Sequence, residues 1–366
     1  MRFWQDENRL YCDSGNTVRF MNMPDHFQLC DVHPALIWLA DRALTNTLYD
    51  DISDPPIERI PGNKVAILNS GGRDSAFVKK MLDDSGIPNC SVYYRWANED
   101  SLVRSRLFEL SDEIIDKRGG FLKTESNFHE YGLEFSTAAG TYNWLIYAVG
   151  AILLADHYDL NAIIGGYLYD AHVLTMGYGF RFPGCPYLKS YKNFVKSLKI
   201  AGLEMPHIAG VCSEYIVETI MAEDDADTIS CGCEFSNNQT GFACWKCCRK
   251  LPYRGINIVP NETIVQNHIN KRKSDTLLYY SITLKEFNIK CPSMDIFSDI
   301  DTGWQKKYIA FDGDKFMNKK WISFIKETML NYGVEPMYDK NIVKNSIDEF
   351  KKRSNIGKTL RDGVWI

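Results

Sequence analysis

The chain has 366 residues, of which 45% are hydrophobic and 24% charged, and its formal net charge is −5 at pH 7. A chain of this length can bury a sizeable core and predicts two domains, or one domain with large additions. The negative charge argues against a surface that coats nucleic acid, and the longest apolar run, 144–155, is too short to span a bilayer.

Residues 1–60 are expected to form an extension ahead of the main domain. The stretch 9–20 predicts a β-hairpin, and a helix is expected over 33–44, with a proline in its first turn. Three prolines and one glycine between residues 51 and 62 predict a linker. The first residues lack the apolar segment of a secretory signal, so we expect a cytoplasmic protein with no membrane partner.

Residues 61–255 alternate between strand and helix patterns. The expected strands are 64–69, 90–96, 121–124 and 162–165, and the expected helices are 76–82, 101–117 and 142–158. Repeated units of this kind predict an α/β fold with a doubly wound parallel sheet. Ligands of such sheets bind beyond the carboxyl ends of the strands, where Gly71–Gly72 and Gly165–Gly166 are expected.

The clearest chemical signal is one strand-to-helix turn, Ser70-Gly-Gly-Arg-Asp-Ser75. The paired glycines let the backbone approach a ligand closely, and the free N–H groups at the start of the next helix favour an anion. Asp74 could cap that helix or hold Mg²⁺. The Walker A ending is missing. The turn therefore predicts a different phosphate-binding loop, with an ordinary glycine-rich turn as the alternative.

This motif resembles the loop of the ATP pyrophosphatases, the PP-loop enzymes, which cleave ATP between its α and β phosphates. The resemblance implies an adenine nucleotide alpha hydrolase-like domain that binds ATP and Mg²⁺. It assigns Asp74, Ser75 and Asp170 to catalysis. The implied nucleotide ligands are Ser70, Gly71, Gly72, Arg73, Asp74 and Ser75, with Gly165 and Asp170 on the opposite side of the nucleotide. For Arg73, an ordinary exposed loop arginine is the alternative.

A second constellation consists of cysteines. Five of the eleven lie between Cys231 and Cys248, and in a cytoplasmic protein such a cluster favours a metal site over disulfides. A C-x-x-C knuckle with two further thiolates can close a structural zinc site. The candidate Zn²⁺ ligands are Cys231, Cys244 and Cys247, with either Cys248 or Cys233 as the fourth. Free thiols or a redox dithiol are the alternatives.

The loop and the cysteines together resemble the 7-cyano-7-deazaguanine synthases over roughly residues 64–250, a typical domain size. Further matches are Asn143, the Gly165-x-x-x-x-Asp170 pattern and Pro206. The chain departs from the family pattern at three places, which are Tyr142 in place of arginine, Phe182-Pro-Gly-Cys185 without its acid, and Lys250 in place of the third spaced cysteine. With these departures the chain also resembles the synthase-like proteins of bacterial anti-phage systems and modification clusters.

The resemblance implies a ligase that adenylates a carboxylate, on a small molecule similar to 7-carboxy-7-deazaguanine, and releases pyrophosphate. Ammonia or an amine then gives an amide or nitrile. On the substrate side, Trp96 could stack on a purine or belong to the core, and Asn143 matches the family. Tyr178 and Phe180 lie in an aromatic loop that could cover a flat heterocycle.

The region 256–366 predicts helices over 315–332 and 340–353. The expected domains are therefore 1–60, 61–255 and 256–366. The slightly basic last region motivates a second hypothesis, in which the activated group is attached to a partner protein or a nucleic acid. A third hypothesis is an ATP-sensing scaffold subunit without catalysis, and a homodimer is one assembly we consider.

Overall fold

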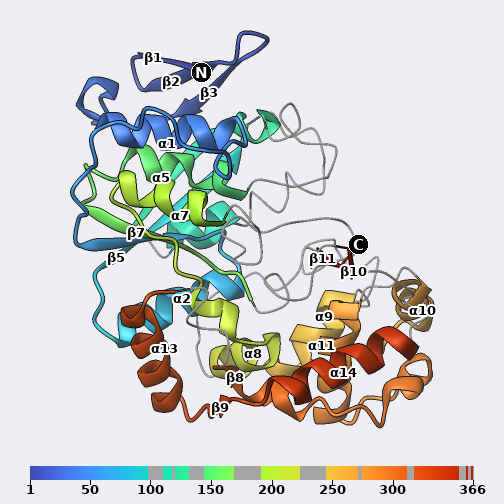
Figure 1. Cartoon of the computed structure of the whole chain (residues 1–366). Coiled ribbons are helices and arrows are strands. Elements are labelled where there is room, and N and C mark those ends of the chain that lie inside the picture. Colours follow the sequence, from blue (N-terminus) through green and yellow to red (C-terminus); the bar gives the residue numbers. More distant parts are fainter. Residues whose placement is uncertain are drawn as a thin grey trace. The chain divides into compact units, whose positions relative to one another are not determined.

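The computed structural model describes two compact units. The described residues are 1–97, 109, 111–117, 120–131, 144–168, 191–222, 245–270, 274–310, 317–353, 360–361 and 364–365. The first unit comprises Met1–Gly71, Val78–Gly166 and Phe180–His207, and the second comprises Gly72–Phe77, Tyr167–Gly179 and Ile208–Ile366. Figure 1 shows the chain coloured along the sequence.

A seven-stranded sheet organises the first unit, in the order β1-β2-β3-β6-β5-β4-β7. Its strands are β1 (Arg2–Asp6), β2 (Arg9–Asp13), β3 (Val18–Asn22), β4 (Lys64–Leu68), β5 (Asn89–Trp96), β6 (Phe121–Ser126) and β7 (Leu160–Gly165). The four strands β6-β5-β4-β7 run parallel to one another. The α/β class is therefore confirmed, and the order of these four strands is consistent with a doubly wound fold.

The amino-terminal strands extend this sheet rather than standing apart from it. The expected hairpin is present as β2 and β3, and β3 pairs antiparallel with β6 through Met21–Ser126 and Asn22–Glu125. The whole sheet is therefore mixed: the strands expected to be parallel are parallel, and residues 1–60 add three antiparallel strands at one edge. The local sequence of a hairpin does not show whether it joins a larger sheet. That depends on pairing with a strand far away along the chain, here β6.

Helices of the first unit include α1 (Pro34–Leu44), α5 (Val149–Leu153), α7 (Tyr191–Ile200) and the part of α2 (Arg73–Asp84) from Val78 onward. α1 begins where the sequence predicts, and the Nδ1 atom of His33 accepts a hydrogen bond from the Ala35 N–H at 3.2 Å. α1 packs against both α5 and α7. The described residues 111–117 of the expected helix 101–117 are also helical.

The long helix expected over 142–158 is wrong in the part that the structure describes. A 3-10 helix, η3 (Trp144–Ala148), leads into α5, and turns follow as far as residue 159. Residues 145–155 are buried apart from Tyr147, so the run is apolar on every side and its periodicity does not fix a helix length. Asp159, with φ of +56°, then turns the chain into β7.

The segment 51–62, expected as a linker, has neither helix nor strand, but Arg59 binds it to the rest of the first unit. Arg59 is 6% exposed and forms an ion pair with Asp156, with 2.6 Å between Nε and Oδ1. Its guanidinium also donates to the carbonyl oxygens of Ala155 and Leu160 at 3.0 Å each, and to that of Gly202 at 3.3 Å. Arg59 therefore ties this segment to the start of β7 and the end of α7.

The second unit is mostly helical. Its helices include α8 (Glu214–Ala222), α9 (Trp245–Lys250), α10 (Glu262–Asn270), α11 (Ser274–Glu286), α13 (Lys319–Asn331) and α14 (Lys340–Arg353). Two short ladders pair β8 (Tyr308–Ile309) with β9 (Pro336–Met337), and β10 (Leu360–Arg361) with β11 (Val364–Trp365). α11 packs against α9, α10 and α14, and the rings of Phe297 and Phe350 stack in the core 4.8 Å apart. Across the described parts of the chain, no helix is long and apolar enough to cross a membrane.

Candidate functional site

The predicted phosphate loop begins at the carboxyl end of β4, in the first unit. Leu68 is the register partner of Val92 in β5 on one side and of Gly165 in β7 on the other. The chain builds β5 and β6 on one side of β4 and then returns to the other side with β7. This is a topological switch point, the place where open α/β sheets bind ligands. The sequence-predicted Ser70, Gly71 and Gly165 therefore lie at the expected edge.

The first half of the loop is held by polar side chains. The Gly71 N–H donates to Oδ1 of Asn69 at 3.0 Å, and Ser111 Oγ donates to the Ser70 carbonyl at 3.0 Å. Gly71 has φ of +79°, which a residue with a side chain adopts at a cost. Asn69 was not predicted as a site residue, although an asparagine ahead of a glycine turn is a recognisable Asx signal.

The second half of the loop starts α2 and belongs to the second unit. The Gly72 carbonyl accepts the Ala76 N–H at 3.0 Å, the first helical bond, and also Ser75 Oγ at 2.9 Å. Asp74 lies in the first turn, where the helix dipole favours a negative charge. The loop therefore has the predicted strand–turn–helix form.

Asp74 belongs to a buried ionic cluster in the second unit. Lys250 Nζ lies 3.2 Å from Oδ1 of Asp74, 3.2 Å from Oε1 of Glu214 and 3.3 Å from Oε1 of Glu218. Two arginines complete the cluster, since Arg73 Nε is 2.7 Å from Glu218 Oε2 and Arg249 Nε is 3.2 Å from Glu214 Oε2. Three cations thus face three carboxylates, and the charges balance.

Burial and pairing act in opposite directions within this cluster. Desolvation by burial raises the pKa of Glu218 to about 7, although Lys250 and Arg73 pull it down. Desolvation lowers the pKa of Lys250, but its three carboxylate neighbours outweigh burial, and the pKa lies above its ordinary value. Lys250 therefore stays an ammonium ion. The sequence did not predict a site role for Glu214, Glu218 or Lys250. Charged residues in a helical pattern are normally expected on the solvent-exposed face.

Arg73 is not the exposed loop arginine that was considered for it. Its side chain is buried, and in addition to its ion pair the guanidinium donates to the Glu218 carbonyl oxygen at 3.2 Å. Phosphate binding by Arg73 stays a prediction. The ion pair with Glu218 does not favour it, because the guanidinium is already bound there.

Trp96, at the end of β5, lies among aromatic side chains of the first unit. Its ring stacks on His129 with 4.3 Å between centroids and 10° between planes, and lies nearly parallel to Tyr147 at 6.1 Å. Trp96 is therefore packed against rings of its own chain, as the core alternative predicts. Purine stacking stays a prediction.

Several predicted site residues lie outside the described residues, so those predictions stand as made. These residues are Asp170, Asn143, Tyr178, Phe180, Cys231, Cys233 and Cys244. Of the remaining zinc candidates, Cys247 and Cys248 are both buried in α9. Both side chains belong to the hydrophobic core of the second unit. Among described side chains, no group of three or more His, Cys, Asp or Glu is arranged to hold a metal ion.

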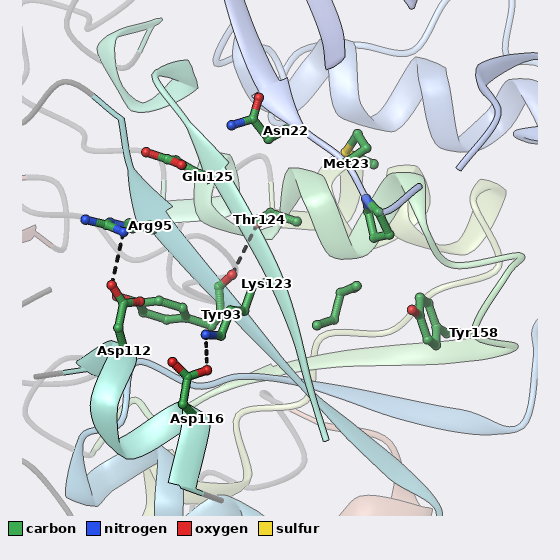
Figure 2. A pocket seen from close by; sticks show the side chains of 12 residues that line it. Asn22, Met23, Tyr93, Arg95, Asp112, Asp116, Lys123, Thr124, Glu125 and Tyr158 are labelled. Carbon is green, nitrogen blue, oxygen red and sulfur yellow. Dashed lines mark hydrogen bonds and ion pairs between the residues drawn. The ribbon is translucent and has the colours of Figure 1, made fainter. Parts of the chain in front are cut away.

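A hollow of about 650 Å³ also opens in the first unit, beside β5 and β6. Figure 2 shows Arg95 turned toward Asp112, at 3.1 Å, and Lys123 toward Asp116. Thr124 Oγ1 donates to the Tyr93 carbonyl at 3.3 Å. Burial raises the pKa of Asp112, while Arg95 lowers it. Both cations of the lining are paired with carboxylates, and the third carboxylate, that of Glu125, leaves the hollow with one excess negative charge.

Comparison of the sequence with models of known protein families and with curated proteins gives no match.

Proposed function

We propose that this chain is a PP-loop ATP pyrophosphatase that adenylates a carboxylate and passes the acyl group to ammonia or an amine. The observation that carries the proposal is the position of the Ser70–Ser75 loop, which leaves β4 beside Gly165 at the switch point of the parallel strands. Positive φ at Gly71 and the helix start at Arg73 support an anion site there.

In the proposed reaction a substrate carboxylate oxygen attacks the α phosphorus of ATP, and pyrophosphate leaves. The amine then attacks the acyl carbon, and AMP leaves while the amine proton passes to solvent. Loop N–H groups would bind the phosphates, and Asp74 is the carboxylate suited to hold Mg²⁺, since carboxylate oxygens are its preferred ligands. Mg²⁺, when bound, supplies charge stabilisation at the phosphates.

The test is turnover by the purified chain with Mg-ATP, 7-carboxy-7-deazaguanine and ammonium. We expect AMP and pyrophosphate in equal amounts, with an amide or nitrile product identified by mass. Asp74→Ala should abolish product, whereas Asp84→Ala, at the other end of α2, should retain it. Formation of ADP and phosphate instead would show cleavage at the wrong bond and reject the proposal.

A second candidate is an ATP-sensing scaffold without turnover. The engagement of Arg73 by Glu218 and of Asp74 by Lys250 favours it, because both charged loop residues already have internal partners. Nucleotide binding without any hydrolysis, measured with labelled ATP across a panel of carboxylates and amines, would support this candidate. Turnover that disappears in Asp74→Ala would exclude it.

A further inference from the structure

Lys250 contacts three carboxylates, two of which are shared with arginines. Its side chain is 7% exposed, and three carboxylates lie within 3.3 Å of its Nζ atom. A buried ammonium ion needs carboxylates close to it, because its removal from water is costly. If Asp74 turns to a metal ion, Glu214 and Glu218 still contact the ammonium, but the cluster then holds two carboxylates for three cations.

Two of the three partners are anchored independently of Lys250. Glu214 uses Oε2 for Arg249 and Oε1 for Lys250, and Glu218 uses Oε2 for Arg73 and Oε1 for Lys250. Each glutamate is thus fixed by an arginine and stays in place if the lysine contact changes. Glu214 and Glu218 are the permanent partners of Lys250.

Asp74 is the partner that solution can reach. Its side chain is 35% exposed, whereas Lys250, Glu214 and Glu218 are at most 7% exposed. Lys250 contacts its Oδ1 atom, the one ion pair of Asp74 among the described residues. A cation arriving from solvent therefore meets the cluster at Asp74, and there it meets the ammonium of Lys250 as well.

We propose that Lys250 is an internal counter-ion that competes with bare divalent cations for Asp74. A free Mg²⁺ ion must weaken the Lys250–Asp74 contact against the repulsion of the ammonium ion. Mg²⁺ bound to ATP arrives within a complex of net negative charge, which Lys250 does not repel. Lys250 thereby selects the metal–nucleotide complex over the metal alone. The inference rests on the proposed function in that it takes Asp74 as the metal-binding carboxylate.

The test titrates the full chain with Mn²⁺ alone, without ATP, and counts free Mn²⁺ by electron paramagnetic resonance. We expect Lys250→Met to bind Mn²⁺ about tenfold more tightly than the natural chain, since one adjacent charge shifts a carboxylate's equilibrium by about this factor. Lys250→Arg keeps the charge and should resemble the natural chain. Lys246→Met, which removes an exposed lysine of α9, is the matched control and should change nothing.

Glu214→Gln tests the same idea in the opposite direction and does not remove the buried lysine. With one permanent partner gone, Lys250 should hold Asp74 more tightly, and Mn²⁺ affinity should fall. Asp74→Asn should erase the gain seen in Lys250→Met.

The proposal is overturned if Lys250→Met binds Mn²⁺ no more tightly than the natural chain, if the gain survives Asp74→Asn, or if no variant binds detectably. If Lys250→Met does not fold, unchanged or tighter binding by Glu214→Gln overturns the proposal. Because no nucleotide or carboxylate is added, a failure of turnover in the experiment above is a separate result.

Discussion

Arg73 and Glu218 form a buried ion pair, with 2.7 Å between Nε and Oε2 and neither side chain more than 3% exposed. The same carboxylate lies 3.3 Å from Lys250 Nζ through its other oxygen. Glu218 therefore compensates two buried cations, one from the start of α2 and one from the end of α9.

We expect Glu218→Ala to lower the free energy of unfolding by about 3–5 kcal/mol, because it leaves buried cations under-compensated. Glu218→Gln keeps the shape and a hydrogen-bond acceptor and should cost less. Urea denaturation followed by circular dichroism measures both. Glu349→Ala, which removes a half-exposed glutamate of α14, should cost less than about 1 kcal/mol, and an equal loss at both positions would contradict the argument.

Two glycines with the same backbone conformation should respond differently to alanine. Gly202 and Gly86 have φ of +61° and +65°, but a Cβ atom at Gly202 would lie 2.6 Å from the Arg59 carbonyl oxygen, whereas at Gly86 it would meet open space. Gly86→Ala should cost about 1 kcal/mol of unfolding free energy for the backbone alone. Gly202→Ala should cost clearly more, because the Arg59 segment must shift. Thermal denaturation of both variants decides this, and similar losses would refute the clash.

Acid should destabilise the protein through His207, which is buried in the first unit. Burial lowers its pKa to about 3 from an ordinary value of 6.5, so the folded protein holds the ring neutral while the unfolded chain protonates it. This contribution to stability is complete above pH 6.5 and is lost as the pH falls toward 3. Between pH 6.5 and 4 the loss is about 3 kcal/mol.

The variant His207→Gln should show a weaker dependence on pH over that range. Its stability at pH 8 gives the cost of the substitution itself, independent of protonation. A dependence as steep as that of the natural chain would assign the acid sensitivity to other groups.

Zinc should be held by the cysteine cluster in a one-to-one ratio. We expect Cys247→Ala to lose the metal, measured by inductively coupled plasma mass spectrometry, because a structural zinc site needs all four thiolates. The fourth ligand is either Cys233 or Cys248, and zinc lost from Cys233→Ala but kept in Cys248→Ala would assign Cys233. Cys30→Ala, at an exposed cysteine, is the control. Zinc lost from Cys248→Ala and kept in Cys233→Ala would assign Cys248 instead.

Local sequence was sufficient to predict much of the sheet and many helices. The branched apolar run before Ser70 appears as β4, the run 90–96 lies within β5, and Pro34 marks the start of α1. These elements are set by neighbours along the chain, namely turn residues, caps and side-chain periodicity. The glycine turn was likewise predicted, because its strand and helix flank it directly.

Contacts between distant residues could not be predicted in this way. Met21 pairs with Ser126 across more than a hundred residues, and nothing in the hairpin itself indicates that partner. The ionic cluster shows the same limit, since α8 places Glu214 and Glu218 four residues apart, a spacing that is equally typical of a solvent-exposed helix face. Only packing shows that this face is buried.

The hydrogen bonds of Arg59 limit where the chain can be divided into fragments for expression. Composition suggests a cut between residues 51 and 62, but a fragment starting at residue 61 would lose the guanidinium that covers the carbonyl groups of Ala155 and Leu160. It would also lose three of the seven strands of the sheet and leave the β6 edge without β3. Such a fragment would expose hydrogen-bonding strand edges and aggregate, so the amino-terminal sixty residues belong in any fragment that contains the phosphate loop.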